Sequence, residues 1–119
     1  MKTFMAVYTG DPKAFEKWQN AHPDPKQRET MERDGMQAWM KWGETHGKAI
    51  VDNGAPLGKT KRVTRDGIAD IRNNLAGYTI VQAESQEAAA KMFLNHPHFT
   101  IFPGDAVEIM ECLPMPKMP

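Results

Sequence analysis

An excess charge of one sign, a cysteine pair and a long apolar run are all missing from this chain. Fifteen Lys and Arg side chains balance fifteen Asp and Glu side chains, so the formal net charge is zero. Proteins that bind nucleic acid usually carry a strongly basic patch, so we expect no nucleic-acid partner. No segment approaches the roughly 18 consecutive apolar residues that cross a bilayer, so we expect no membrane association either. The single Cys112 excludes an internal disulfide.

Standard signatures of catalysis and targeting are also missing. The sequence has no phosphate-binding glycine loop, no nucleophile–base triad and no complete set of metal ligands. The apolar run before Asp11 is too short for a secretory signal peptide. We therefore expect a cytoplasmic protein with no cofactor and no bound metal ion.

The length of 119 residues fits one domain near the small end of the range, where pairing with a second copy adds useful burial. We expect this domain to cover residues 1–113, followed by a Pro- and Met-rich tail at 114–119. Nine methionines and three tryptophans stand out in the composition. Methionine fills gaps in cores and also lines adaptable pockets, and composition leaves both uses open.

Residue patterns predict an alternation of strands and helices. Short β-branched and aromatic runs predict strands at 3–9, 49–52, 78–83 and 106–113. Helical spacing predicts helices at 12–20, 27–46 and 86–95. Asn53-Gly54 has the sequence of a tight turn, and Asp66-Gly67 that of a hairpin reaching out between residues 58 and 74. This order predicts an α+β ferredoxin-like sandwich, an antiparallel sheet with two main helices on one face.

Alternate residues of a strand point to opposite faces of the sheet. One set is almost wholly apolar and is expected to lie under the helices: Met5, Val7, Thr79, Val81, Val107 and Ile109. The other set mixes aromatic, apolar and polar residues: Phe4, Ala6, Tyr8, Tyr78, Ile80, Gln82, Glu108, Met110 and Cys112. A monomer would leave this mixed face uncovered. We therefore expect a homodimer in which the two mixed faces close into a shared barrel.

His96 and His98 flank Pro97 at the end of the last main helix. In one interpretation they form a helix stop in which His98 faces solvent. In a second, His96 lines a pocket and acts as an acid or base near neutral pH. In a third, both imidazoles bind a metal ion, which requires further ligands.

Three other groups of residues are open to a functional interpretation. Glu108 is expected on the mixed face beside Tyr8, Tyr78 and Gln82, either desolvated by a dimer and suited to proton transfer, or simply solvated. Trp39 and Trp42 lie three residues apart, so at least one should border a groove or an interface. The only basic cluster forms either a solvated flap or a cationic entrance for an acidic substrate: Lys59, Lys61, Arg62 and Arg65.

Several motifs together resemble the YCII-related domain family and its DGPF-type branch, a group of dimeric α/β barrels. The similarity covers most of the chain: Met1 to Tyr8, Met36-x-x-Trp39-Met40-x-x-Gly43, Asn53-Gly54-x-Pro56-Leu57, Leu75-x-Gly77-Tyr78, Ala83-Glu84-Ser85-x-Glu87-x-Ala89 and His96-Pro97. The resemblance implies a homodimer with a cleft between sheet and helices, mostly without an assigned reaction. Distant barrel relatives include isomerases, monooxygenases and dechlorinating enzymes.

The chain departs from the family pattern at two places. The Asp-Gly-Pro-Phe signature is represented only by Asp66-Gly67, because Ile68 and Ala69 follow. Some members pair a His on the long helix with an Asp before the proline that follows the last helix, and here Met36 and His96 occupy those positions. Any chemistry would then depend on His96 with Glu108 or Tyr78.

These observations lead to three hypotheses. The first is an enzyme that transfers protons on a small cyclic or aromatic compound, with His96 as the acid or base and Glu108 as a weaker candidate. The second is a ligand-binding or accessory domain without catalysis, and the third is a packed dimerisation module. The residues expected to contact a ligand are Tyr8, Met36, Trp39, Tyr78, Gln82 and His98.

Overall fold

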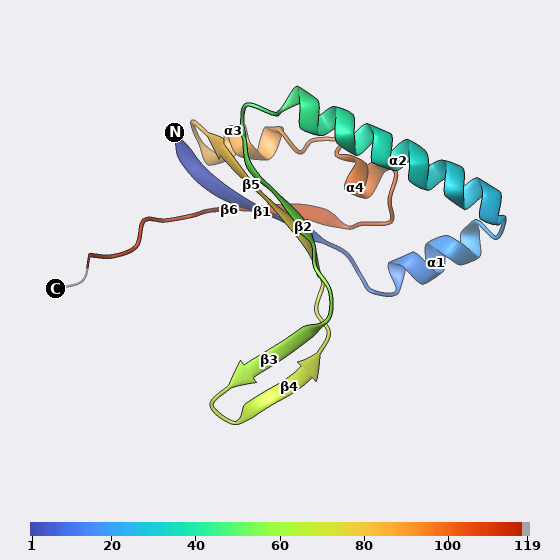
Figure 1. The fold of residues 1–119 in the computed structure, drawn as a ribbon, viewed down its shortest axis with the longest axis horizontal. Helices are drawn as coiled ribbons and strands as arrows, with labels where there is room; N and C mark the ends of the chain where they lie inside the picture. Colours follow the sequence, from blue (N-terminus) through green and yellow to red (C-terminus); the bar gives the residue numbers. More distant parts are fainter. Residues whose placement is uncertain (118–119) are drawn as a thin grey trace.

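A computed structural model describes residues 1–117 as a four-stranded antiparallel sheet with helices on one face and a hairpin arm below it (Figure 1). The first half of the chain contains β1 (Lys2–Thr9), α1 (Ala14–Ala21), α2 (Pro25–Thr45) and β2 (Ile50–Pro56). The second half contains β3 (Thr60–Thr64), β4 (Gly67–Ile71), β5 (Leu75–Ala83), α3 (Gln86–Lys91), α4 (Pro97–Thr100) and β6 (Ala106–Glu111). The expected α+β class, with an antiparallel sheet and helices on one face, is confirmed.

The main sheet has the order β2-β5-β1-β6, with β1 paired to β5 on one side and to β6 on the other. Helices α2 and α3 cover one face of this sheet. The core consists of buried residues from the strands, from α3 and from the segment after it: Phe4, Ala6, Tyr8, Val81, Ala83, Ala89 and Phe93. The expected inward residues of the last main helix, Ala89, Met92 and Phe93, all belong to this core or pack on it.

Local side-chain chemistry sets where the helices begin. Asp24 accepts a hydrogen bond from the Lys26 amide and caps α2, with Pro25 at the first helical position. Ser85 accepts from the amide of Ala88 and caps α3. Helix α3 is shorter than the predicted 86–95 because the chain turns after Lys91 and reaches a left-handed conformation further on.

The expected facing of β1 was wrong. Phe4, Ala6 and Tyr8 lie under the helices, whereas Met5 and Val7 lie on the outer face. The strand is apolar on both faces, so alternation alone could not choose between them. The register decides the question, because Ala6 lies opposite Thr79 and therefore shares its face. The outer face thus carries Met5, Val7, Tyr78, Ile80, Gln82, Glu108 and Met110.

The prediction of a tight turn at Asn53-Gly54 was also wrong. Both residues lie inside β2, where the pairing with β5 is irregular between Asp52 and Ala55. The Asp52 carboxylate accepts a hydrogen bond of 2.8 Å from the Gly54 amide, and Gly54 adopts a φ of 68°. A side chain there would collide with the carbonyl oxygen of Tyr78. The turn sequence therefore forms a bulge that bends the strand.

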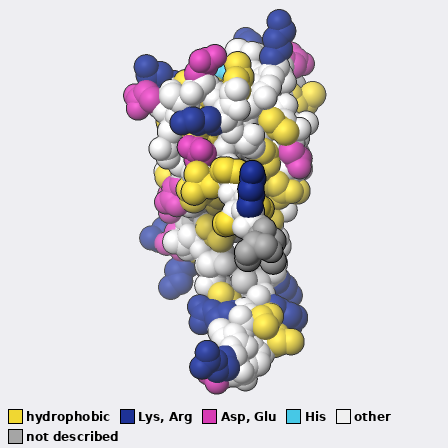
Figure 2. Space-filling view, turned by 90° about the vertical axis from the view of Figure 1, so that its left-hand side faces the viewer, with side chains coloured by type: hydrophobic (Ala, Val, Ile, Leu, Met, Phe, Trp, Pro, Cys, Tyr) yellow, Lys and Arg dark blue, Asp and Glu magenta, His cyan; other side chains and the backbone are white. Residues whose placement is uncertain are grey.

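The expected hairpin between residues 58 and 74 is confirmed as β3 and β4, which form their own two-stranded sheet. Gly67, with a φ of 120°, follows the turn at Arg65 and Asp66. The hairpin projects from the body as a narrow arm that carries Lys and Arg side chains and a small hydrophobic patch (Figures 1 and 2). Val63 and Ile68 face each other across its strands, and both are exposed.

The C-terminal segment continues beyond β6 without regular structure. The last strand ends at Glu111 rather than at Leu113, although the Cys112 amide still donates to the Thr3 carbonyl. Residues 114–117 of the expected tail are exposed, and residues 118–119 lie outside the described part of the chain. No helix within residues 1–117 combines the length and the apolar character needed to cross a bilayer.

The contact between α2 and the segment after α4 depends on a glycine. A Cβ at Gly35 would come within 2.5 Å of the Phe102 ring, whereas a Cβ at Gly43 on the same helix would meet nothing within 4 Å. We expect Gly35→Ala to destabilise the protein by about 1–3 kcal/mol through overpacking. Gly43→Ala should stabilise it by up to about 1 kcal/mol through helix propensity.

Urea unfolding of the two variants and the wild type measures both effects. Equal stabilisation by the two substitutions would show that α2 does not pack against Phe102 in this way.

Candidate functional site

His96 lies at the start of α4, fully buried under the helices. Its Nδ1 accepts a hydrogen bond of 3.0 Å from the His98 amide, which caps α4. Four aromatic rings surround its imidazole at centroid distances of 4.5 to 5.7 Å: Trp39, Trp42, Tyr8 and Phe93. His96 is therefore held in one orientation inside an aromatic box.

This environment keeps His96 neutral. Because Nδ1 accepts a hydrogen bond, the neutral ring carries its hydrogen on Nε2, and Nε2 is buried without a hydrogen-bond partner in the described residues. Burial, and then the nearby His98 and His46, lower the pKa of His96 to about 4. A neutral imidazole at pH 7 that faces only aromatic rings is poorly placed to exchange a proton with a ligand.

His98 has a different environment. Its Nε2 lies 2.8 Å from the Thr9 carbonyl oxygen and must therefore donate to it, which leaves Nδ1 as an acceptor in the neutral ring. Gly104 leaves room for this ring, since a Cβ there would collide with it. Only 9% of His98 is exposed, so the interpretation in which His98 faces solvent is wrong.

Tyr8 lies beside both histidines, with its ring centroid 5.3 Å from His96 and 5.2 Å from His98. Its hydroxyl is 2.8 Å from the Thr79 hydroxyl, which in turn donates to the Asn53 carbonyl at 3.3 Å. The Tyr8 hydroxyl then donates to Thr79 and keeps its lone pairs for another donor. Burial raises the pKa of Tyr8, and the hydrogen bond with Thr79 lowers it in part, so the phenol stays protonated at neutral pH.

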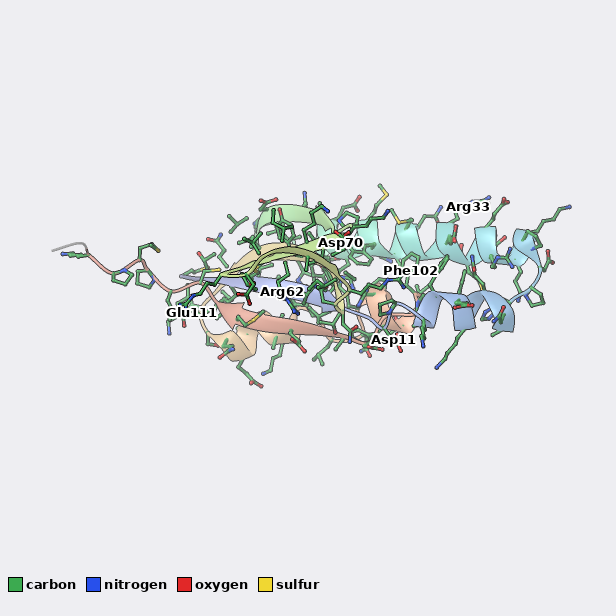
Figure 3. The ribbon with its side chains drawn as sticks, turned by 90° about the horizontal axis from the view of Figure 1, so that it is seen from below. Asp11, Arg33, Arg62, Asp70, Phe102 and Glu111 are labelled. Carbon is green, nitrogen blue, oxygen red and sulfur yellow. The ribbon has the colours of Figure 1, made fainter. Side chains whose placement is uncertain are left out.

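A cavity of about 390 Å³ lies between α2, the bulge of β2, the start of β5 and α4. This volume is typical of small-molecule sites. Its walls are mostly apolar and aromatic, and they include Phe102 from the loop after α4, labelled in Figure 3. The lining residues are Tyr8, Met36, Trp39, Asn53, Gly54, Ala55, Pro56, Ala76, Gly77, Tyr78, Thr79, His98 and Phe102.

Five residues predicted to contact a ligand therefore line one cavity: Tyr8, Met36, Trp39, Tyr78 and His98. Trp39 borders this cavity, whereas Trp42 packs on the core and donates to the Met92 carbonyl at 2.7 Å. The expectation that one of the two tryptophans borders a groove is confirmed.

Three predicted site residues lie apart from the cavity lining. His96 stands behind it, in the aromatic box. Glu108 is exposed opposite Val7 on the outer face, so its expected position beside Tyr8 was wrong. Gln82 also lies on the outer face and donates to the Lys48 carbonyl at 3.3 Å. The error in the facing of β1 explains why Tyr8 and Glu108 were grouped together.

Sequence reasoning did not identify Thr79, Phe102 and the Thr9 carbonyl as parts of this site. Thr79 hydrogen-bonds to Tyr8 across β1 and β5, and Thr9 orients a ring 89 residues away. Only the strand register and the path of the loop after α4 bring these groups together. Among the described residues, no three His, Cys, Asp or Glu side chains gather as a metal site.

The buried neutral His96 makes stability depend on pH. Its pKa is about 4 in the folded protein and near 6.5 in the unfolded chain, so the unfolded state binds the extra proton between these values. We therefore expect the protonation of His96 to lower the free energy of unfolding by roughly 3 kcal/mol as the pH decreases from about 6.5 to about 4.

Denaturant unfolding as a function of pH tests this effect in wild type and in His96→Asn, which keeps a capping oxygen for the His98 amide and cannot titrate. The variant should lose stability less steeply over this window. Parallel pH profiles for the two proteins would contradict a neutral, buried His96.

Comparisons with known proteins show a structural similarity but no match in sequence. No family model and no curated protein sequence matches the chain. The fold is similar to that of 5-chloro-2-hydroxyhydroquinone dehydrochlorinase from Burkholderia phenoliruptrix AC1100, solved in complex with 2,5-dihydroxybenzoquinone. The TM-score is 0.53 with 16% sequence identity, over 91% of this chain and 90% of that chain. At this identity the likeness establishes a shared fold.

Proposed function

We propose that the cavity beside His98 binds a small planar, cyclic or aromatic compound. One observation carries this proposal: aromatic and apolar walls converge on two oriented polar groups, the Tyr8 hydroxyl and the His98 ring. Flat rings bind well between aromatic walls, and a few fixed polar groups select their oxygen substituents. The similar fold of a dehydrochlorinase that was solved with 2,5-dihydroxybenzoquinone supports the same ligand class.

We further propose that the chain is a YCII-related protein of the DGPF-type branch with a ferredoxin-like, dimeric α/β-barrel fold. The motifs around Trp39, Gly77 and His96-Pro97 support this assignment, as does the fold likeness. The outer sheet face is the surface that a second copy would cover, because Met110 there is 45% exposed among apolar neighbours.

Light scattering at micromolar concentration measures this assembly. We expect the mass of a homodimer, and the mass of a monomer would refute the shared barrel.

The proposed chemistry is proton transfer of the isomerase or lyase type. His98 Nδ1 removes a proton from a carbon next to a ring carbonyl, and the negative charge moves to that oxygen. The proton then returns to another atom of the ring. The Thr9 carbonyl fixes the His98 tautomer for this role, and His96 is a positioning residue that holds the His98 backbone.

A non-catalytic ligand-binding domain is the second candidate. No Asp, Glu, Lys or Arg lines the cavity, so the imidazole of His98 and the phenols of Tyr8 and Tyr78 are its only ionisable side chains. A site with such sparse polar chemistry can bind a flat ring without converting it. Turnover, and not binding, separates the two candidates.

Binding is tested with 2,5-dihydroxybenzoquinone and a matched pair of substitutions on α2. Met36 lines the cavity, whereas Met40 lies one turn further along and does not, and both are exposed, at 57% and 64%. Met36→Trp should fill the cavity and weaken binding by about tenfold or more, and Met40→Trp should leave binding unchanged. Calorimetry measures both, and equal affinities would reject the cavity as the site.

Catalysis is tested by exchange of the ring hydrogens of the same compound with D2O, followed by NMR. These hydrogens exchange through the keto tautomer of the compound, in which the ring carbon becomes an sp3 CH2 group next to a carbonyl and supplies the proton that His98 removes. Wild type should accelerate the exchange, and His98→Gln, which keeps a donor for Thr9, should slow it while affinity is retained. Tight binding without accelerated exchange by wild type would favour the non-catalytic domain.

A further inference from the structure

A second, more open hollow of about 1170 Å³ adjoins the cavity at the base of the hairpin arm. Its walls come from the start of α1, the two ends of the β3–β4 hairpin and the loop after α4. The hollow and the cavity share three lining residues, Ala76, His98 and Phe102. A ligand whose ring fills the cavity can therefore extend past His98 and Phe102 into the hollow.

The base of the arm is tied to the body at this place. The Gly10 amide donates to the Asn74 carbonyl at 3.0 Å, and the Leu57 amide donates to the Ala76 carbonyl at 2.9 Å. Asn73 bridges the two ends of the hairpin through a bond of 3.2 Å to the Thr60 hydroxyl. These bonds hold the lining of the hollow in place while the tip of the arm projects away (Figure 1).

Charge distinguishes the hollow from the cavity. The cavity has no Asp, Glu, Lys or Arg in its lining, whereas the hollow is lined by Lys59, Lys61, Arg72, Asp11 and Asp70. Lys61 is already paired with Asp70 at 2.7 Å. Figure 3 labels Asp11 and Asp70, which come from opposite sides of the hollow, the loop before α1 and the arm.

Two cations remain for a ligand. Within residues 1–117, Lys59 and Arg72 make neither an ion pair nor a side-chain hydrogen bond. The remaining charged residue in the lining of the hollow is Asp11, whose carboxylate accepts a hydrogen bond of 2.9 Å from the Lys13 amide. The sequence-based basic cluster is thus divided, because Lys59 and Lys61 line the hollow, whereas Arg62 and Arg65 do not.

We propose that the ligand of this protein is a ring compound with an anionic tail, and that Lys59 and Arg72 bind the carboxylate of that tail in the hollow. The inference rests on the proposed function, since the ring must occupy the cavity for the tail to reach the hollow. An apolar cavity selects the ring, and the cationic entrance selects a charged tail and attracts it from solution.

The test compares 2,5-dihydroxyphenylacetate with its methyl ester, which removes the charge and keeps the ring. At low ionic strength the acid should bind wild type about fivefold more tightly than the ester, and added salt should reduce this preference. Arg72→Gln and Lys59→Gln should each reduce the preference, and the double variant should remove it. Arg62→Gln, on the same arm and outside the hollow, is the matched control and should keep it.

Binding of 2,5-dihydroxybenzoquinone, which has no tail, separates this inference from the proposed function. If that compound binds and the acid and ester bind equally, the anionic tail is refuted and the cavity stands. If the preference for the acid survives in the double variant, Lys59 and Arg72 are not its source. If none of the three compounds binds, both the proposed function and the tail are refuted.

Discussion

The packing of α2 across one face of the four-stranded sheet is the contact on which the rest of the molecule depends. Trp39 and Trp42 from this helix rest on the core formed by β1 and β5. Gly35, one turn before Trp39, lets the Phe102 ring approach the helix backbone. The same contact therefore builds the core, encloses His96 and brings Phe102 to the cavity.

This packing imposes a cost on the buried polar groups. His96 satisfies Nδ1 through the His98 amide but leaves Nε2 without a conventional partner among the described residues. Buried polar atoms usually find such partners, and the aromatic rings around His96 offer only weak acceptors for an N–H. The protein accommodates this by keeping the ring neutral, as its lowered pKa indicates. The hydrogen bond from the His98 amide to His96 also fixes the backbone of His98, which lines the cavity.

The cavity and the hollow differ in the physics of recognition. In the cavity, aromatic walls and the oriented groups of Tyr8 and His98 favour a flat ring. In the hollow, the proposed recognition depends on charge, through Lys59 and Arg72 at the base of the arm. Because the hairpin base is hydrogen-bonded to the body, the two environments are held side by side. The arm thus contributes to the entrance of the site even though its tip projects into solvent.

Much of the fold follows from local sequence patterns, because helix caps, turn residues and alternation act over a few residues. The pattern at 86–95 and Asp66-Gly67 indicate where a helix begins and where a hairpin turns, and the structure has both there. Local patterns failed where two outcomes have similar local energies. Asn53-Gly54 suits a turn or a bulge, and only the pairing of β2 with β5 selects the bulge.

The sequence by itself thus determined the class of fold, the hairpin arm and five of the thirteen residues that line the cavity. Tertiary structure alone decided the facing of β1, since a strand that is apolar on both sides has no local preference. That choice moved Tyr8 to the histidines and separated it from Glu108. Tertiary structure also gave His96 and His98 different environments, although they lie two residues apart. Their burial and their hydrogen-bond partners depend on segments distant in the chain.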